Sequence, residues 1–169
     1  RLAAARDCGF DSVTEYLCTQ AFQSQKELDA CGRGHVREID YADCAAYTRR
    51  HWAEMAKGPL PYIPQVSTGW DSTPRCRPDE PYPWRALEYP YILTVTNNTP
   101  ALFKALLADA KRFAENDPHR PGAVYINGWN EYTEGTYLVP DNHTGDARLK
   151  AVAEVFGRTP GDAFTIERN

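Results

Sequence analysis

Apolar and small side chains recur every three or four residues in several stretches of the chain, which is the spacing of one face of an α-helix. Asp40 and Thr99 stand where two such stretches begin, and their side chains can accept hydrogen bonds from the first free N–H groups of a helix. Gly9 is suited to end the first stretch. The pattern predicts helices over residues 1–8, 41–56, 100–117 and 146–156.

Short runs with strand composition alternate with these helices. The predicted strands cover residues 12–17, 62–66, 91–96 and 123–127, and residues 18–39 have the composition of a loop. Strands that alternate with helices favour parallel βαβ units with right-handed crossovers. In such units the loops after the strands gather at one end of the sheet, where active sites lie. We therefore look for functional residues just after each predicted strand.

Composition and charge narrow the class of protein. The chain has 169 residues, of which 42% are hydrophobic and 25% charged, as in a soluble globular domain. The formal charge of −4 argues against a protein that binds nucleic acid by neutralising phosphates. No run approaches the ~20 apolar residues of a membrane helix, and no apolar signal-peptide region follows the N-terminus. We therefore predict that the chain binds neither nucleic acid nor a membrane.

The end of the last predicted strand carries the strongest chemical signal. Glu131 and Glu134 stand three residues apart within Trp-Asn-Glu-Tyr-Thr-Glu-Gly. Cleavage of a glycosidic bond needs two carboxyl groups, one that donates a proton and one that stabilises or attacks the developing cation. If both point into one pocket, like-charge repulsion would keep one of them protonated. The alternative is that one glutamate is solvated and the other caps a turn, because Glu-x-x-Glu pairs are common in helices.

A second strand end, after residue 66, carries further polar and aromatic side chains. Asp71 and Arg75 could donate and accept hydrogen bonds with sugar hydroxyls, and Trp70 could offer a flat face to a pyranose ring. Asp71 and Arg75 could instead pair with each other and brace a loop. The aromatic segment 82–91 is open to the same two interpretations, a sugar platform or a loop packed on its own rings.

Cysteine and histidine spacing indicates neither a metal site nor a redox motif. The motifs that cradle nucleotide phosphates are also absent, so no cofactor is predicted. The five cysteines are separate buried thiols, or Cys31 and Cys76 form a disulfide in a secreted protein. Asn97 and Asn142 begin sequons that matter only in a eukaryotic secretory route. The compartment stays open, with a secreted or periplasmic location favoured over the cytoplasm.

Three blocks together are similar to the C-terminal half of the glycoside hydrolase family 99-like proteins, which include the WbsX-type proteins of polysaccharide loci. The blocks are Gly-Trp-Asp-Ser-Thr-Pro-Arg (69–75), Asn-Thr-Pro (98–100) before Phe103, and Ile-Asn-Gly-Trp-Asn-Glu-Tyr-Thr-Glu-Gly (126–135) with Leu138 and Pro140-Asp141. The resemblance implies a (β/α)8 barrel of the TIM type that acts on complex glycans. It places this chain as the C-terminal four βα units, with residues 1–169 as half of one catalytic domain.

The resemblance also implies roles for individual residues in a retaining, two-glutamate glycoside hydrolase like the endo-α-mannosidases of family 99. Glu131 would assist attack by the substrate's own 2-hydroxyl, and Glu134 would be the acid/base. Tyr16 would contact a carboxylate. The remaining candidates for substrate binding are Trp129, Asn130, Tyr132, Tyr137, Trp70, Asp71 and Arg75.

Two other functions stay open at this point. The chain could belong to a glycosyltransferase of polysaccharide synthesis, although the phosphate-binding loop or Asp-x-Asp site that a nucleotide-sugar donor normally requires is absent. It could also be a glycan-binding half-barrel without activity. A closed eight-unit barrel typically needs ~250 residues, and a half-barrel leaves open sheet edges. We therefore expect an N-terminal barrel half from the same or another chain, or self-association, to complete the fold.

Overall fold

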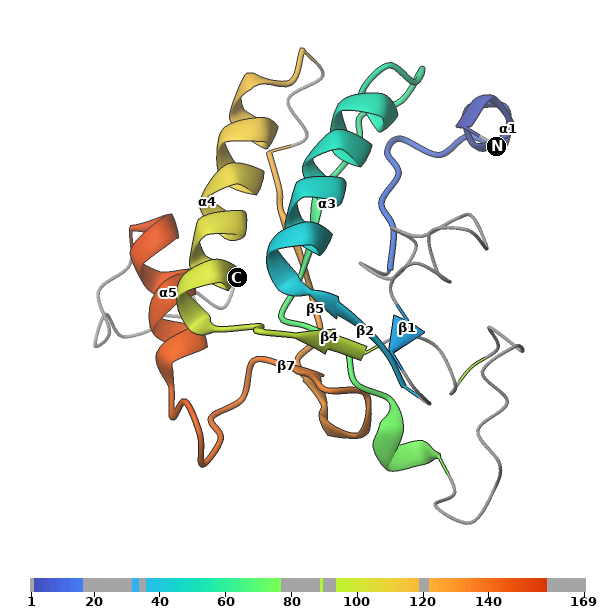
Figure 1. Cartoon of the computed structure of the whole chain (residues 1–169). Coiled ribbons are helices and arrows are strands. Elements are labelled where there is room, and N and C mark those ends of the chain that lie inside the picture. Colours follow the sequence, from blue (N-terminus) through green and yellow to red (C-terminus); the bar gives the residue numbers. More distant parts are fainter. Residues whose placement is uncertain are drawn as a thin grey trace, which may run out of the picture.

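The computed structural model describes residues 2–16, 32–33, 36–76, 89, 94–118 and 122–157 (Figure 1). It is a mixed α/β structure in which short parallel strand pairs lie beside three longer helices. The helices are α1 (Leu2–Asp7), α3 (Tyr41–Met55), α4 (Pro100–Asn116) and α5 (Ala147–Phe156), with 3-10 turns η2 (Thr73–Arg75) and η3 (Tyr132–Glu134). The strands are β1 (Gly32–Arg33), β2 (Val36–Asp40), β3 (Gln65–Ser67), β4 (Thr94–Thr96), β5 (Tyr125–Asn127), β6 (Asn130–Glu131) and β7 (Thr136–Tyr137).

All four predicted helices are present, and their predicted caps are confirmed. The Asp40 side chain accepts a hydrogen bond from the N–H of Ala42 at 2.8 Å, and the Thr99 side chain accepts from the N–H of Leu102. The pKa of the Asp40 carboxyl is lowered by hydrogen bonds from the Asn97 amide and from Ala42. Gly9, two residues after the end of α1, has φ +85°, a backbone conformation that favours glycine. Residues that can satisfy free helix ends therefore fix these boundaries.

Two of the strand pairs are parallel, and neither joins strands that follow one another in the chain. β3 pairs with β5, with Val66 opposite Ile126, and β2 pairs with β4, with Ile39 opposite Val95. A hydrogen bond of 2.7 Å from the N–H of Val95 to the carbonyl of Trp70 joins β4 to the segment after β3. No closed barrel forms among the residues that the structure describes.

Two sequence predictions about strands need correction. Residues 18–39 have the composition of a loop, yet Val36–Asp40 forms the strand β2, because it finds a parallel partner in β4 that lies more than fifty residues further along the chain. The predicted strand 12–17 is reduced to one parallel bridge between Val13 and Tyr62. Residue 17 and residues 91–93 of two predicted strands lie outside the described residues.

The core lies between the helices and the strand pairs. α4 packs between α3 and α5 (Figure 1), and its buried residues include Phe103 and Leu107. The ring of Phe113 lies 5.7 Å from that of Trp52 on α3 and 6.4 Å from that of Tyr62 before β3. The Tyr41 hydroxyl donates to the carbonyl of Ser67 at 2.6 Å, so that the start of α3 is tied to the end of β3. This packing supports the ends of β3 and β5, where the predicted functional residues follow.

No helix among the described residues is long and apolar enough to cross a membrane. Cys31, half of the disulfide considered with Cys76, lies outside the described residues.

Candidate active site

The segment after β5 folds into a small hairpin that carries both glutamates. β6 pairs antiparallel with β7, and the turn η3 between them contains Glu134. Thr136 is fully buried, and its hydroxyl donates to the carbonyl of Asn127 at 2.9 Å. The N–H of Tyr137 donates to the hydroxyl of Thr68 at 2.9 Å, just after β3. Buried hydroxyl groups thus anchor the hairpin to the ends of β3 and β5.

A backbone contact holds the hairpin against the segment that follows β3. The N–H of Asp71 donates to the carbonyl of Glu134 at 2.7 Å. Gly135 has φ +61°, and a Cβ built on it would come within 2.8 Å of the backbone nitrogen of Asp71. Only glycine allows this approach without displacement of one segment. The glycine that follows Glu134 in the sequence is therefore required for η2 and η3 to meet.

This approach brings Arg75 to both glutamates. Its Nη1 donates to Oε1 of Glu134 at 2.8 Å, and its Nη2 lies 3.4 Å from Oε2 of Glu131. Its Nε donates to the hydroxyl of Thr133 at 2.7 Å. The Tyr89 hydroxyl also accepts from Nη1, and the guanidinium lies 5.5 Å from the centre of the Tyr89 ring. One cation therefore joins the two carboxylates.

The two glutamates differ in their exposure. The side chain of Glu134 is 9% exposed, whereas that of Glu131 is 46% exposed. A buried carboxylate thus lies beside an exposed one, so the two glutamates have different environments. The two carboxylates and Arg75 leave the cluster with a net charge of −1 when both glutamates are ionised.

Tyr16 is brought to the same site from the N-terminal part of the chain. Its backbone carbonyl accepts a hydrogen bond from the side-chain amide of Asn127 at 2.8 Å and a longer one of 3.4 Å from Gln65. Burial and the negative charges of Glu134 and Glu131 raise the pKa of the Tyr16 phenol. The phenol therefore keeps its proton over the whole neutral range and can act as a hydrogen-bond donor at the site.

The aromatic residues of the hairpin lie on its exposed side. Trp129 and Tyr132 are among the most exposed large side chains of the described residues. The rings of Tyr132 and Tyr137 lie 5.1 Å apart, and Arg148 lies 5.2 Å from the centre of the Tyr137 ring. Asn130 is exposed at the start of β6. Trp129, Tyr132 and Asn130 are thus open to a ligand, whereas the ring of Tyr137 is already packed.

Two expectations from the sequence differ from the structure. Trp70 is 2% exposed and belongs to the core, because the strand end turns it inward, so that its ring offers no face to a sugar. The pairing of Asp71 with Arg75 is replaced by two separate sets of contacts. Asp71 accepts from the N–H and the hydroxyl of Thr73, which opens η2, while Arg75 reaches across to η3.

Three further residues at the site were not predicted from the sequence. Thr133 and Tyr89 hold the guanidinium of Arg75, and Asn127 holds the backbone carbonyl of Tyr16. Thr133 lies between the two glutamates of the Glu-x-x-Glu block, so the sequence could have indicated that it belongs to the site. Tyr89 lies in the aromatic segment 82–91, which was considered as a sugar platform and not as a partner of Arg75. The contact of Asn127 with Tyr16 joins segments far apart in sequence, and no local pattern indicates it. Among the described residues, no group of three or more His, Cys, Asp or Glu side chains could hold a metal ion.

Comparison with known proteins places the chain in a family. The family model described as "Glycosyltransferase WbsX" matches residues 4–152. Proteins described as "Uncharacterized protein WxcX", from two strains of Xanthomonas campestris pv. campestris, are 27% identical over 165 residues, which is 95% of this chain and 21% of theirs. The chain thus spans about a fifth of the length of these relatives. No solved structure matches.

The family match covers the hairpin with both glutamates, the segment that contains Arg75 and the segment that contains Tyr16. Because it extends over most of the sequence, the chain belongs to the WbsX glycosyltransferase family.

Proposed function

We propose that the protein containing this chain hydrolyses a glycosidic bond in a complex glycan or polysaccharide, with Glu131 and Glu134 as the reacting pair. The observation that carries the proposal is that both carboxylates contact one guanidinium next to the carboxyl ends of two parallel strands. Membership of a carbohydrate-active family supports a glycan as the substrate class. Glycoside hydrolysis needs two carboxyl groups at one site.

In the proposed retaining mechanism, the substrate's own 2-hydroxyl is the first nucleophile. Glu131 accepts the proton of that hydroxyl while its oxygen forms a bond to the anomeric carbon. Glu134 donates a proton to the glycosidic oxygen, and the bond from this oxygen to the anomeric carbon breaks. Water then attacks the anomeric carbon of the anhydro-sugar, and the bond from this carbon to the 2-oxygen breaks. Glu134 accepts a proton from the water, and Glu131 returns a proton to the 2-oxygen.

The exposed side chains around the pair are the proposed contacts to the sugar. Trp129 and Tyr132 have open faces for the apolar side of a pyranose ring, and Asn130 can bond its hydroxyl groups. Tyr16 is the proposed hydrogen-bond donor beside the carboxylates, because its phenol stays protonated. Asp71 and Tyr137 complete the wall of the site, since Asp71 touches Gly135 and Tyr137 packs on Tyr132.

We further propose that residues 1–169 form about half of a (β/α)8 barrel, with the other half supplied by the rest of the protein or by another chain. The parallel pairing of β2 with β4 and of β3 with β5 is consistent with βαβ units. The curated relatives are about five times as long as the matching region, so they contain ample sequence for a complete barrel.

The second candidate is transfer of a sugar from an activated donor, which the description of the matching family favours. A donor with a nucleotide diphosphate needs cations or a phosphate-binding loop. The guanidinium of Arg75 in the described part of the site is already paired with two carboxylates. Hydrolysis therefore fits the described part of the site better than transfer from a nucleotide-sugar donor does.

The experiment measures release of reducing ends from a panel of defined oligosaccharides and polysaccharides by the whole protein and by Glu131→Gln and Glu134→Gln. General acid–base catalysis contributes about 10²–10⁴-fold, so each variant should lose at least a hundredfold in turnover on the glycan that the wild type cleaves. Glu154→Gln is the matched control, because Glu154 pairs with Lys104 on the exposed side of α5. Unchanged turnover in Glu134→Gln would contradict the proposal.

A further inference from the structure

The guanidinium of Arg75 is almost fully committed to protein acceptors. A guanidinium has five N–H donors. Nε uses its single donor on Thr133, and Nη1 uses both of its donors, on Glu134 and Tyr89. Nη2 has one donor on Glu131, which leaves one N–H for any other group. Arg75 is therefore poorly placed to serve as a general ligand for sugar hydroxyls.

The backbone around Arg75 is held as firmly as its side chain. The N–H of Arg75 donates to the carbonyl of Ser72 at 2.9 Å within η2. The carboxylate of Asp71 fixes the start of this turn through Thr73, and the N–H of Asp71 bonds the carbonyl of Glu134. Hydrogen bonds therefore connect the guanidinium of Arg75, the two glutamates and the backbone of both turns.

The positive charge of Arg75 offsets the repulsion between the two glutamate carboxylates. Two carboxylates that face one space repel each other, and without a cation between them they either separate or share a proton. The planar guanidinium can bond two carboxylates along two fixed directions at once, which the single point charge of a lysine ammonium does not reproduce. Arg75 is the described cation that contacts both glutamates.

We propose that Arg75 is a positioning residue of the site, which fixes the separation and orientation of Glu131 and Glu134 through one bridging guanidinium. The inference rests on the proposed hydrolase function and deepens it. Arg75 acts through the glutamates, and not as a contact to the substrate. The inference predicts that removal of the Arg75 side chain leaves a space that matches a guanidinium ion in shape and charge.

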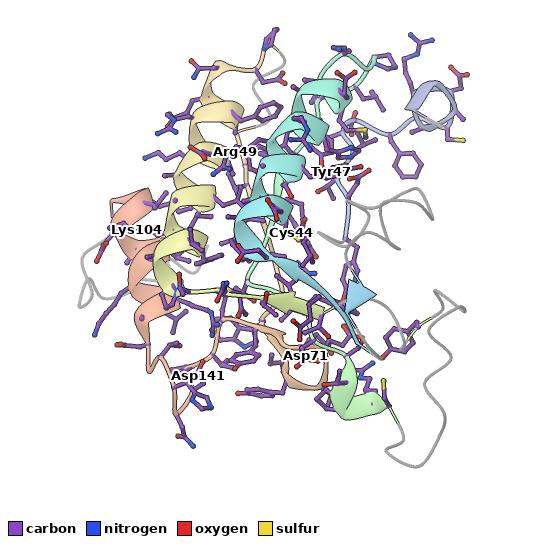
Figure 2. All side chains as sticks on the ribbon, viewed as in Figure 1. Cys44, Tyr47, Arg49, Asp71, Lys104 and Asp141 are labelled. Atoms are coloured by element: carbon purple, nitrogen blue, oxygen red, sulfur yellow. The ribbon has the colours of Figure 1, made fainter. Side chains whose placement is uncertain are left out.

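The experiment uses the whole protein with Arg75→Ala and free guanidinium at low millimolar concentration. Displacement of reacting groups by about 1 Å can cost about 10²-fold in rate, so kcat should fall by this factor with KM close to the wild-type value. Guanidinium should restore kcat along a saturating curve, while ammonium at the same concentration should not. Arg49→Ala is the control, because Arg49 pairs with Asp109 on the helices, away from Asp71 and η2 (Figure 2). Failure of guanidinium to restore kcat in a folded Arg75→Ala protein would overturn the inference.

A binding measurement separates this inference from the proposed function. Guanidinium should bind Arg75→Ala in a calorimetric titration, and it should not bind Arg75→Ala combined with Glu131→Gln and Glu134→Gln. If guanidinium binds Arg75→Ala but the wild type hydrolyses no glycan, the positioning role of Arg75 is supported and the hydrolase function is contradicted. Equal binding of guanidinium to Arg75→Ala and to the triple variant would overturn the positioning role of Arg75. If Arg75→Ala does not fold, Arg75→Lys replaces it, and wild-type kcat in that variant would overturn the inference, because a lysine lacks the planar fork.

Discussion

The N–H of Asp71 donates a hydrogen bond of 2.7 Å to the carbonyl of Glu134. This bond joins the segment after β3 to the hairpin after β5, which are more than sixty residues apart in sequence. It places the last residue of η2, Arg75, where its guanidinium reaches both glutamates. The geometry of the candidate site thus depends on a backbone contact as much as on the side chains that would react.

Gly135→Ala tests this contact. At φ +61° an alanine is strained by about 1–3 kcal/mol, and its Cβ would also meet the Asp71 backbone at 2.8 Å. Gly145→Ala is the matched control, because Gly145 has φ +58° and nothing within 4 Å of the added Cβ. Thermal unfolding should show a clearly larger loss of stability for Gly135→Ala. Equal losses in the two variants would mean that η2 and η3 do not approach as described.

Thr136→Val tests the anchor of the hairpin. The variant keeps the shape of the side chain but removes the buried hydroxyl that donates to the carbonyl of Asn127. The free energy of unfolding should fall by about 1–2 kcal/mol. Thr94→Val is the comparison, because the buried Thr94 hydroxyl has no hydrogen-bond partner among the described residues, and its loss should be neutral or stabilising. Denaturant titration measures the free energy of unfolding of both variants. A larger loss in Thr94→Val than in Thr136→Val would contradict the role of Thr136 as the anchor.

Asn127→Ala tests how Tyr16 is held. The Asn127 amide donates to the Tyr16 carbonyl at 2.8 Å, and its loss leaves only the longer bond from Gln65. The amide of Val13 bonds the carbonyl of Pro61, and the amide of Ile63 bonds the carbonyl of Val13, three residues before Tyr16. Both amides should exchange hydrogen faster in this variant. Asn116→Ala removes an equally short bond to a carbonyl of α4 and should leave those amides unchanged. No difference between the two variants would contradict the link.

Asp141 makes stability depend on pH in the acid range. Hydrogen bonds from the N–H and hydroxyl of Thr144, the N–H of His143 and the charge of Arg148 lower the pKa of this carboxyl from 3.8 to about 2. A carboxyl with a lowered pKa in the folded state contributes stability above its unfolded pKa, and that stability is lost as the pH falls through the folded value. Chemical unfolding between about pH 4 and about pH 2 should therefore show a steeper loss in the wild type than in Asp141→Asn. Parallel curves would contradict the assignment.

The helices were predictable because their signals are local. Asp40 and Thr99 cap helices by bonds to residues two and three positions ahead, so the sequence alone contains the interaction. The strand β2 was not predictable in the same way, since its partner β4 is distant in sequence and the pairing decides the structure.

The candidate site divides along the same line. Glu131 and Glu134 were identified from their spacing at a strand end and from a resemblance, and both signals are local in the sequence. The role of Arg75 depends on the meeting of η2 with η3, which only the fold supplies. Trp70 follows a predicted strand end and was considered as a flat face for a pyranose ring. The structure instead places its ring in the core.

The measurement that tests the central claim most directly is mass spectrometry of the products formed by the whole protein in water enriched in oxygen-18, with no nucleotide sugar present. If Glu131 and Glu134 carry out hydrolysis, the glycan should be cut, and one oxygen-18 atom should appear at each new reducing end. Glu134→Gln should show no such label. Products that form only when a nucleotide sugar is added, that are longer than the starting glycan and that carry no oxygen-18 would contradict the account.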